Sequence, residues 1–230
     1  MQGREFKDAL FGQFAQIGSA FGSPKRIEII DLLAQGERHV DAIAGETGLT
    51  VANTSRHLQV LKAAHLVVGR KEGLLVFYRL ADPTVFRGYR ALRELAEGRV
   101  AEVGRLVHDY FASADGLEPV EVQELLRRAR EGDVVVLDVR PPSEYAAGHI
   151  AGALSVPLGE LERRLADLPK GKPFVAYCRG PYCVLAAEAV RRLREKGLDA
   201  IRLKEGYPEW RQAGLPVEQG SHPPRRNHES

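Results

Sequence analysis

The sequence predicts two domains, an α+β domain made mostly of helices followed by an α/β domain with a central parallel sheet. At 230 residues the chain is long enough for two domains, each with a core of its own. The first half shows apolar residues at helical spacing and then a pair of short strand-like segments. The second half alternates helical patterns with short apolar runs, and the run Val134–Leu137 is typical of a strand buried on both faces of a parallel sheet.

The first half begins with helical patterns. Apolar residues predict a helix from Phe6 to Phe21 and a second helix that starts at Pro24 and stops before Gly36. Shorter helices are predicted at 40–47 and 51–64. The tight turn between them makes Thr50 the natural N-cap of the second. Two short helices joined in this way form a helix-turn-helix.

The chain then changes to the period of a strand. Val67-Val68 and Leu74–Tyr78 flank the segment Arg70–Gly73, which predicts a hairpin, or wing, with a basic turn. From Thr84 to about Phe111 a helical pattern continues without a proline. Because so long an apolar face is unusual for a helix on a monomer's surface, we expect it to form a dimer interface with the first helix.

The helix-turn-helix and the hairpin together resemble a known family. Thr50–Lys62, Ala64–Val67 and Val76–Leu80 are similar to the winged helix-turn-helix of arsenic-repressor-family regulators, over about residues 5–112. The resemblance implies a homodimer that binds a double-stranded DNA operator, the second helix contacting base edges and phosphates and the wing the backbone or minor groove. The predicted DNA-binding residues are Thr50, Asn53, Thr54, Ser55, Arg56, Gln59, Arg70 and Lys71. For any single one, the alternative is that it only solvates an amphipathic helix.

The first half offers neither a thiol nor a convincing metal site. Where many members of that family carry metal-sensing cysteines, this chain has His39 and Asp41, whose imidazole and carboxylate suit a soft ion poorly. At the end of the long helix only His108 and Asp109 could join a zinc site, which needs more ligands. We therefore expect no metal and no cofactor, and a signal that enters elsewhere in the chain.

The two cysteines of the chain, Cys178 and Cys183, lie in one predicted loop. The surrounding elements alternate, with helices at 120–131, 158–167 and 183–196 and strands at 134–138, 174–177 and 200–203. Cys178 therefore stands at the end of a buried strand, before a short turn that leads into a helix. Backbone N–H groups and the helix dipole stabilise a thiolate at such a place. This predicts a nucleophile that takes up sulfane sulfur as a persulfide.

The motifs around this loop resemble the rhodanese domain over about Val120–Val217. They are Asp138–Arg140, Glu144-Tyr145, Gly148–Ala153, Val175–Cys183 and Gly206–Trp210. The resemblance implies that Cys178 is the catalytic cysteine. Arg179 is predicted to attract an anionic donor, while Gly180, Pro181 and Tyr182 complete a cradle for the persulfide. The remaining polar and aromatic motif residues are predicted to hold loops or pack in the core rather than act as acids, bases or stacking platforms: Asp138, Arg140, Glu144, His149 and Trp210.

Cys183 occupies the last position of the loop, where many active rhodaneses have a basic or hydroxyl residue. It either resolves a persulfide on Cys178 or fills space toward the core. Two functions stay open: a repressor that responds to reactive sulfur species through Cys178, and a thiosulfate, persulfide or polysulfide sulfurtransferase that uses its first domain for localisation or dimerisation. Oxyanion chemistry, such as arsenate reduction or phosphatase activity, is disfavoured because the loop between the cysteines is tight.

Composition completes the prediction. With 44% hydrophobic and 28% charged residues the chain is too apolar for disorder, and a net charge of +2 means that DNA binding must rest on local placement of charge. We expect a DNA-binding and dimerisation domain at 1–112, a linker at 113–119, a rhodanese-like domain at 120–219 and a disordered tail at 220–230. Neither a leader nor a membrane span is apparent, so we expect a cytoplasmic protein without membrane contact.

Overall fold

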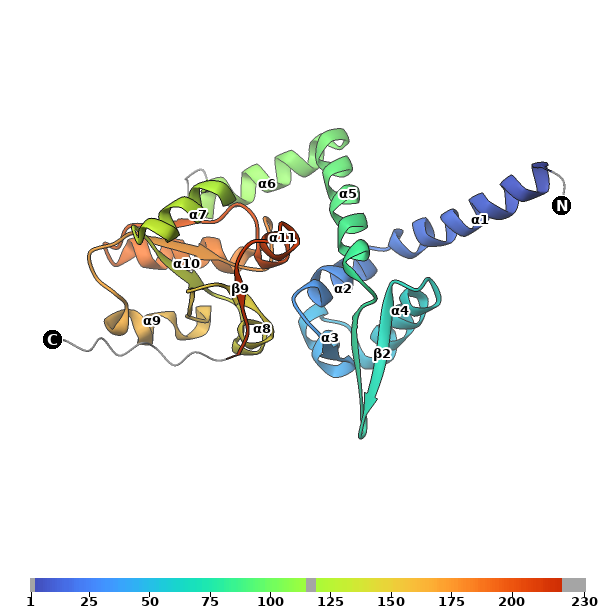
Figure 1. Cartoon of the computed structure of the whole chain (residues 1–230), viewed down its shortest axis with the longest axis horizontal. Helices are drawn as coiled ribbons and strands as arrows, with labels where there is room; N and C mark the ends of the chain where they lie inside the picture. The colour runs from blue at the N-terminus through green and yellow to red at the C-terminus, as the bar shows by residue number, and fades with distance from the viewer. Residues whose placement is uncertain (1–2, 115–118, 221–230) are drawn as a thin grey trace. The chain divides into compact units, whose positions relative to one another are not determined.

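The structure, a computed structural model, describes residues 3–114 and 119–220. The chain divides into two compact units, residues 1–96 and 97–230, each described below by itself (Figure 1). Much of the predicted linker 113–119 and nearly all of the predicted tail 220–230 lie outside the described residues. Within the described residues, no helix is both long and apolar enough to cross a membrane.

The first unit opens with helices where the apolar spacing predicts them. They are α1 (Gly3–Phe21), α2 (Pro24–Ala34), α3 (Val40–Thr47) and α4 (Val51–Ala63). Helix α3 ends at Gly48, which has the left-handed backbone conformation (φ 64°) that favours glycine. The Thr50 hydroxyl then accepts a hydrogen bond from the Asn53 amide at 3.3 Å and caps α4. The predicted helix-turn-helix is therefore present, and its apolar faces enclose buried side chains such as Ile30, Ile43 and Leu58.

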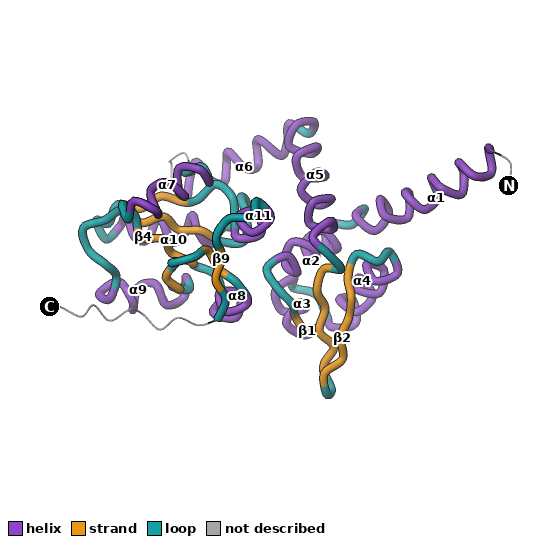
Figure 2. The backbone as a smooth tube through the Cα atoms, viewed as in Figure 1, coloured by secondary structure: helices purple, strands orange, loops and turns teal. Residues whose placement is uncertain are grey.

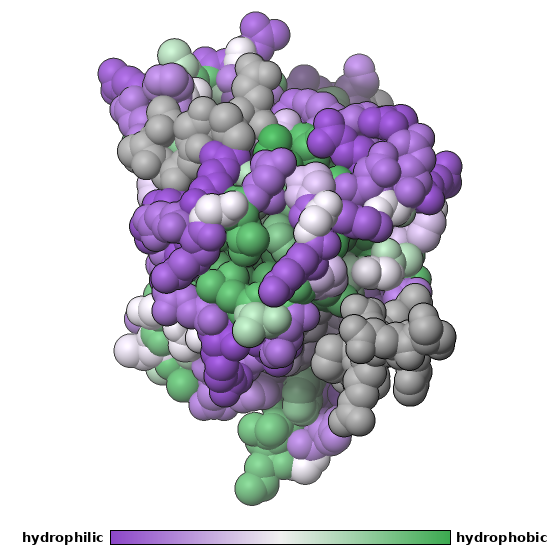
Figure 3. Space-filling model, turned by 90° about the vertical axis from the view of Figure 1, so that its left-hand side faces the viewer, coloured by the Kyte–Doolittle hydropathy of each residue, from purple (hydrophilic) through white to green (hydrophobic). Residues whose placement is uncertain are grey.

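The wing differs from its prediction in where the turn lies. Strand β2 (Val67–Glu72) pairs antiparallel with β3 (Leu75–Leu80), and β3 pairs in turn with the short strand β1 (Arg38–His39). Because Glu72 is directly opposite Leu75, the turn is only Gly73-Leu74, and Gly73 has a φ of 60°. Arg70 and Lys71, predicted to form the turn, are strand residues instead. Leu74 at the tip is fully exposed. Figure 3 shows hydrophobic surface at the lower end of its view.

The predicted long helix is wrong as a single element. It is interrupted at Val100, which separates α5 (Pro83–Arg99) from α6 (Ala101–Ala114). Gly98 lowers the helix propensity just before the break, and the Val103 amide then donates to the Val100 carbonyl at 2.9 Å as the next helix begins. An apolar repeat that continues in the same period cannot reveal such an interruption.

The second unit is built on a parallel sheet with the strand order β6-β4-β7-β8. These strands are Leu154–Ser155, Val135–Asp138, Phe174–Tyr177 and Ala200–Arg202. Figure 2 shows them in orange with helices on either side. Alternate residues of β7 point into two different cores. On one face, Phe174 and Ala176 pack with helices α9 (Leu161–Arg164) and α10 (Val184–Glu195). On the other face, Val175 and Tyr177 pack with helices α7 (Val122–Glu131) and α11 (Tyr207–Gln212). The predicted α/β class is confirmed.

Several short elements of this unit were not predicted. They are α8 (Pro142–Ala147), β5 (His149–Ile150) and β9 (Val217–Glu218), as well as β6 and α11. The helix predicted at 158–167 is divided into a 3₁₀ turn (Leu158–Glu160), α9 and a second 3₁₀ turn (Leu165–Asp167). Elements this short lack a full period of apolar residues, so a pattern cannot identify them. Trp210, predicted to pack in the core, is buried.

Candidate functional site

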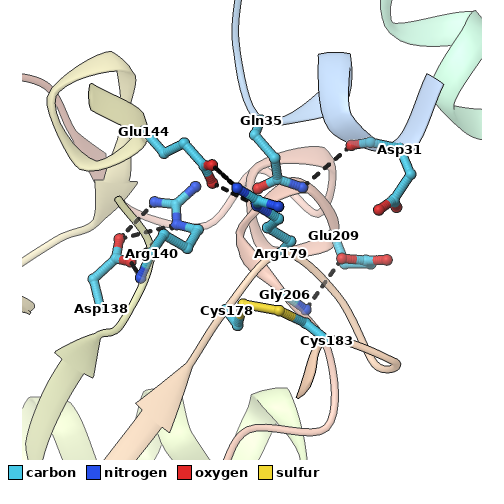
Figure 4. Close-up of a disulfide and its surroundings, with 10 residues drawn as sticks. All are labelled: Asp31, Gln35, Asp138, Arg140, Glu144, Cys178, Arg179, Cys183, Gly206 and Glu209. Atoms are coloured by element: carbon cyan, nitrogen blue, oxygen red, sulfur yellow. Dashed lines mark hydrogen bonds and ion pairs between the residues drawn. A yellow bond between two sulfur atoms is a disulfide. The ribbon is translucent and has the colours of Figure 1, made fainter. Parts of the chain in front are cut away.

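The candidate site is the loop that joins strand β7 to helix α10. Cys178 directly follows β7 and is buried, whereas Cys183 is half-buried at the N-cap of α10. A disulfide joins the two sulfur atoms, with the Cα atoms 6.1 Å apart (Figure 4). The N-terminus of a twelve-residue helix thus lies beside a two-cysteine loop, and its free N–H groups favour negative charge there.

The backbone of this loop is held at several points. The Tyr207 amide donates to the Cys178 carbonyl at 3.1 Å, and the Cys183 amide donates to the Gly180 carbonyl at 3.1 Å. Gly206 passes so close to the loop that a Cβ atom there would lie 2.4 Å from the Arg179 carbonyl carbon and the Gly180 nitrogen. The backbone of the segment before α11 therefore packs directly against the backbone of the loop.

The sequence predicts that Arg179 attracts an anionic donor, but in the structure its side chain is held by a carboxylate. Its Nε and Nη2 atoms donate to Glu144 Oε1 at 3.0 and 2.6 Å, and the Glu144 side chain is 1% exposed (Figure 4). The reason is tertiary, because α8 brings a buried carboxylate to the loop and that carboxylate needs a partner. Arg179 in this conformation orders the loop.

A second buried ion pair supports β4 and the segment after it. Arg140 donates from Nη2 to Asp138 Oδ2 at 2.5 Å and to the Gly148 carbonyl at 2.8 Å. The Tyr177 hydroxyl donates to the same carboxylate at 2.5 Å. Burial, and then the nearby Asp138 charge, raise the pKa of Tyr177 well above its ordinary value of 10.0, so the hydroxyl stays a donor. These residues hold loops, the role that the sequence predicted for Asp138 and Arg140.

His149 and Glu144, the other two polar motif residues, are also engaged by the surrounding structure. The Nδ1 atom of His149 lies 2.8 Å from the Tyr145 carbonyl, and its ring stacks on the Tyr145 ring with centroids 3.6 Å apart. Glu144 faces Arg179, as described above. Neither geometry requires a part in acid or base chemistry.

Glu209 is a residue beside the loop whose contribution the sequence did not reveal. It is buried in α11, and its Oε2 accepts a hydrogen bond from the Gly206 amide at 3.1 Å. Its Oε1 would lie 3.9 Å from a Cβ atom added at Gly180. The only signal in the sequence is an acidic residue three positions after a glycine, the spacing of a helix N-terminal capping pair.

The remaining loop residues lie nearer the surface. Pro181 is half-buried and Tyr182 is exposed. The Tyr182 hydroxyl donates to the carboxylate of Glu97, a residue near the end of α5 that belongs to the same compact unit. The hydrogen bond therefore joins the loop to a residue that is distant in the sequence but belongs to the same unit.

The predicted DNA-contacting residues of α4 divide by exposure. Asn53, Arg56 and Gln59 are exposed, and Ser55 is half-buried. Thr54 is fully buried and its hydroxyl donates to the Thr50 carbonyl at 3.0 Å, so its prediction as a DNA-contacting residue is wrong. Thr54 lies one residue after Asn53, and a step of about 100° around the helix turns it toward the core.

On the wing, Lys71 is exposed but Arg70 is held by carboxylates. Arg70 pairs with Glu37 at 2.8 Å and with Glu72 at 2.5 Å. Hydrogen bonds from Glu37 and then from Glu72 raise the pKa of Arg70, and both carboxylates offset its positive charge. This leaves Lys71 as the stronger candidate for a phosphate contact on the wing.

Of the residues weighed for metal binding in the first half, His39 and Asp41 lie at the start of α3, whereas His108 and Asp109 are exposed on α6. His39 caps α3, where Nδ1 accepts from the Ala42 amide at 3.4 Å, and the same atom lies 3.7 Å from Asp41. Across residues 3–114 and 119–220, no three His, Cys, Asp or Glu side chains gather closely enough to hold a metal ion.

The fold and site define a winged helix-turn-helix regulator that carries a rhodanese-like domain. Residues 23–68 match the family described as bacterial regulatory protein, arsR family, and residues 121–213 match the rhodanese-like domain. The chain is 45% identical over 215 residues to HTH-type transcriptional regulator Rv0324 of Mycobacterium tuberculosis, and the match covers 94% of each protein. The chain therefore belongs to the arsR family of bacterial transcriptional regulators, in its form with a rhodanese-like domain.

Other relatives match less than half of the chain each. HTH-type transcriptional regulator CmtR of M. tuberculosis is 39% identical over 83 residues, which cover 36% of this chain and 68% of CmtR. A sulfurtransferase of Allochromatium vinosum is 33% identical over 92 residues, which cover 40% of this chain and 84% of that protein. A solved homodimeric DNA-binding domain from Mycobacterium bovis is 40% identical, covers 44% of this chain and 91% of its own, and has a TM-score of 0.40.

Proposed function

We propose that this regulator is a repressor whose operator binding responds to reactive sulfur species through a persulfide on Cys178. The observation that carries the proposal is the position of the thiols. Both cysteines of the chain lie in the loop between β7 and α10 of the rhodanese-like domain, and the DNA-binding half has none. A sulfur signal read by a thiol therefore has to be read in that loop.

The chemistry follows from the place of Cys178. In the reduced protein its thiolate attacks the sulfane sulfur of a donor, forming a new S–S bond on Cys178 while the rest of the donor leaves as a thiolate or as sulfite. The helix dipole of α10 and the N–H groups of the loop stabilise negative charge on the cysteine and on the persulfide. Thiosulfate, a persulfide and a polysulfide all present a sulfane sulfur of this kind.

The proposed operator contacts come from α4 and the wing. Asn53, Arg56 and Gln59 are exposed on one helix and offer donors and acceptors for base edges and phosphates. Ser55 on the same helix and Lys71 on β2 add contacts at the edge of this proposed DNA-binding surface. Thr50 contributes to operator binding mainly by capping the N-terminus of α4, which fixes the start of that helix.

We also propose that the regulator acts as a homodimer. Helix α1 carries several large apolar side chains that are 39–59% exposed, and exposed apolar residues recur along α5 and α6: Phe6, Phe11, Phe14, Ile17, Leu95, Leu106 and Tyr110. Monomeric proteins rarely expose so many large apolar side chains along one surface. A second copy of the same surfaces would bury them and would place two copies of α4 for two half-sites.

Operator binding with and without a sulfur donor tests the proposal. The operator fragment would be taken from the DNA upstream of the chain's own gene, and binding measured by fluorescence anisotropy with the protein first reduced. We expect a glutathione persulfide to lower the affinity of the wild type at least tenfold and to leave Cys178→Ser unchanged. An equal response in both proteins would remove Cys178 as the sensor.

The second candidate is an enzyme that transfers sulfur to an external acceptor. The observations in its favour are the match of 121–213 to the rhodanese-like domain and the similarity over 92 residues to a protein named as a sulfurtransferase. Steady sulfur transfer from thiosulfate to cyanide that disappears in Cys178→Ser, together with operator binding that ignores the donor, would favour the enzyme. Operator binding that follows the donor without steady transfer would favour the sensor.

A further inference from the structure

We infer that the two cysteines act together as a dithiol that reduces sulfane sulfur to hydrosulfide, with the Cys178–Cys183 disulfide as the end state of each event. This inference rests on the proposed persulfide at Cys178 and specifies what happens to it. The loop would not pass its sulfur to an external acceptor. It would release the sulfur as hydrosulfide, and its two thiols would be oxidised to the disulfide.

The first support is that the loop holds both sulfur atoms within bonding reach. The disulfide closes across Cα atoms 6.1 Å apart, within the usual range for such bonds. The loop backbone is confined by Gly206 on one side and by the Arg179–Glu144 pair on another. A thiol at Cys183 therefore stays beside any persulfide on Cys178, at a high effective concentration.

The second support is the difference in exposure between the two cysteines. Cys178 is 1% exposed, and its neighbours in the core include Leu137, Ala176 and Ala186. An external acceptor must reach a sulfur enclosed in this way, whereas Cys183 is already in place. Cys183 is half-buried, so a molecule from solvent can meet its sulfur more readily.

The reaction balances in two steps. In the first, Cys178 thiolate attacks the outer sulfur of thiosulfate, the S–S bond of thiosulfate breaks, and sulfite leaves with the bond's electron pair. In the second, the proton of Cys183 moves to the sulfane sulfur of the persulfide, and the Cys183 thiolate attacks Sγ of Cys178. The bond between Sγ and the sulfane sulfur breaks, and hydrosulfide leaves with the bond's electron pair. The two thiols lose two electrons and the sulfane sulfur gains them.

The disulfide is then opened from the side of Cys183. A low-molecular-weight thiol attacks the sulfur of Cys183 and expels Cys178 as a thiolate, the form that α10 and the loop amides stabilise. A second thiol molecule attacks the mixed disulfide on Cys183 and restores both protein thiols. The sum is one thiosulfate and two thiols converted into sulfite, hydrosulfide and one external disulfide.

The test uses the full-length protein, reduced and freed of reductant, with thiosulfate and, separately, glutathione persulfide as the donors. Hydrosulfide is measured by a trapping reagent and the protein by intact mass. We expect the wild type to release one hydrosulfide per chain and to become lighter by two hydrogen atoms. With thiosulfate as the donor, Cys183→Ser should become heavier by one sulfur atom and release hydrosulfide only when a thiol is added. Cys178→Ser should do neither.

The outcomes separate this inference from the proposed function. A wild type that keeps the added sulfur, as Cys183→Ser does, overturns the dithiol mechanism and leaves a persulfide sensor. A wild type that neither gains sulfur nor releases hydrosulfide with either donor overturns both. Since the wild type alone distinguishes these results, the test does not depend on how well the variants fold.

Discussion

Gly206 illustrates how a single residue shapes the sulfur loop from outside it. We predict that Gly206→Ala destabilises the rhodanese-like domain by about 1–3 kcal/mol, because the added methyl group would lie 2.4 Å from the backbone of Arg179 and Gly180. Because the loop backbone would be displaced, the rate of sulfur uptake by Cys178 should fall as well. Urea unfolding and intact mass after reaction with thiosulfate would measure the two effects.

Gly159→Ala is the matched control for this prediction. It adds the same methyl group in the same domain, but a Cβ atom there meets nothing within 4 Å. A Gly206→Ala protein as stable and as reactive as the Gly159→Ala protein would mean that the contact between the two segments does not order the loop.

The ion pair of Glu144 and Arg179 yields a second prediction at the same scale. Glu144→Gln keeps the shape of the side chain but removes the negative charge that faces the mostly buried Arg179 guanidinium. We expect a loss of about 2 kcal/mol of stability in urea, the magnitude of a hydrogen bond to a charged group. Combining it with Arg179→Gln should cost less than the sum of the single changes, and strict additivity would show that the pair is not coupled.

At the scale of an element, α10 carries an acid-sensitive cluster on its exposed face. Glu188 accepts from Arg191 at 2.6 Å and from Arg192 at 2.7 Å, and these hydrogen bonds lower the pKa of Glu188 from 4.5 to about 2. A carboxylate with a lowered pKa stabilises the fold above its ordinary pKa, and that stability is lost as the pH falls from 4.5 toward 2.

Glu188→Gln should therefore make thermal stability less dependent on pH in this window, by a modest amount because the pairs face solvent. Melting temperatures of both proteins between neutral and acidic pH would show it, and high salt should reduce the difference between them. Parallel pH profiles at low salt would rule out a contribution of this cluster.

The elements also show where patterns succeed and fail. The strand Phe174–Tyr177 and the helix Val40–Thr47 have the predicted bounds, because each combines a full apolar run or period with a clear boundary residue. The break at Val100 was missed because the apolar period continues across it. The sequence predicts Arg70 and Lys71 in the turn between two apolar segments, whereas pairing across the hairpin decides that they belong to β2.

At the scale of the whole molecule, the exposed apolar row on α1 predicts self-association. Phe14 is 59% exposed and lies in edge contact with Phe11. We expect Phe14→Glu to convert the dimer to a monomer in sedimentation or light scattering and to weaken operator binding by at least tenfold, while the helix content by circular dichroism stays the same.

Gln13→Glu is the control, since it adds the same charge at the position just before Phe14 on the same exposed helix. It should leave the mass in solution unchanged. A wild-type protein that is a monomer at micromolar concentration, or a Phe14→Glu protein that stays a dimer, would mean that α1 is not the interface.

The two-domain order, the helix-turn-helix and the position of Cys178 at the end of a buried strand can be predicted from the amino-acid sequence. These features depend on local period, capping and chain order, which are written in consecutive residues. The burial of Thr54, the pairing of Arg179 with Glu144 and the close approach of Gly206 to the loop are visible only in the folded chain. Such facts arise where segments distant in the chain meet, and there the need to pack side chains and pair buried charges outweighs any local preference.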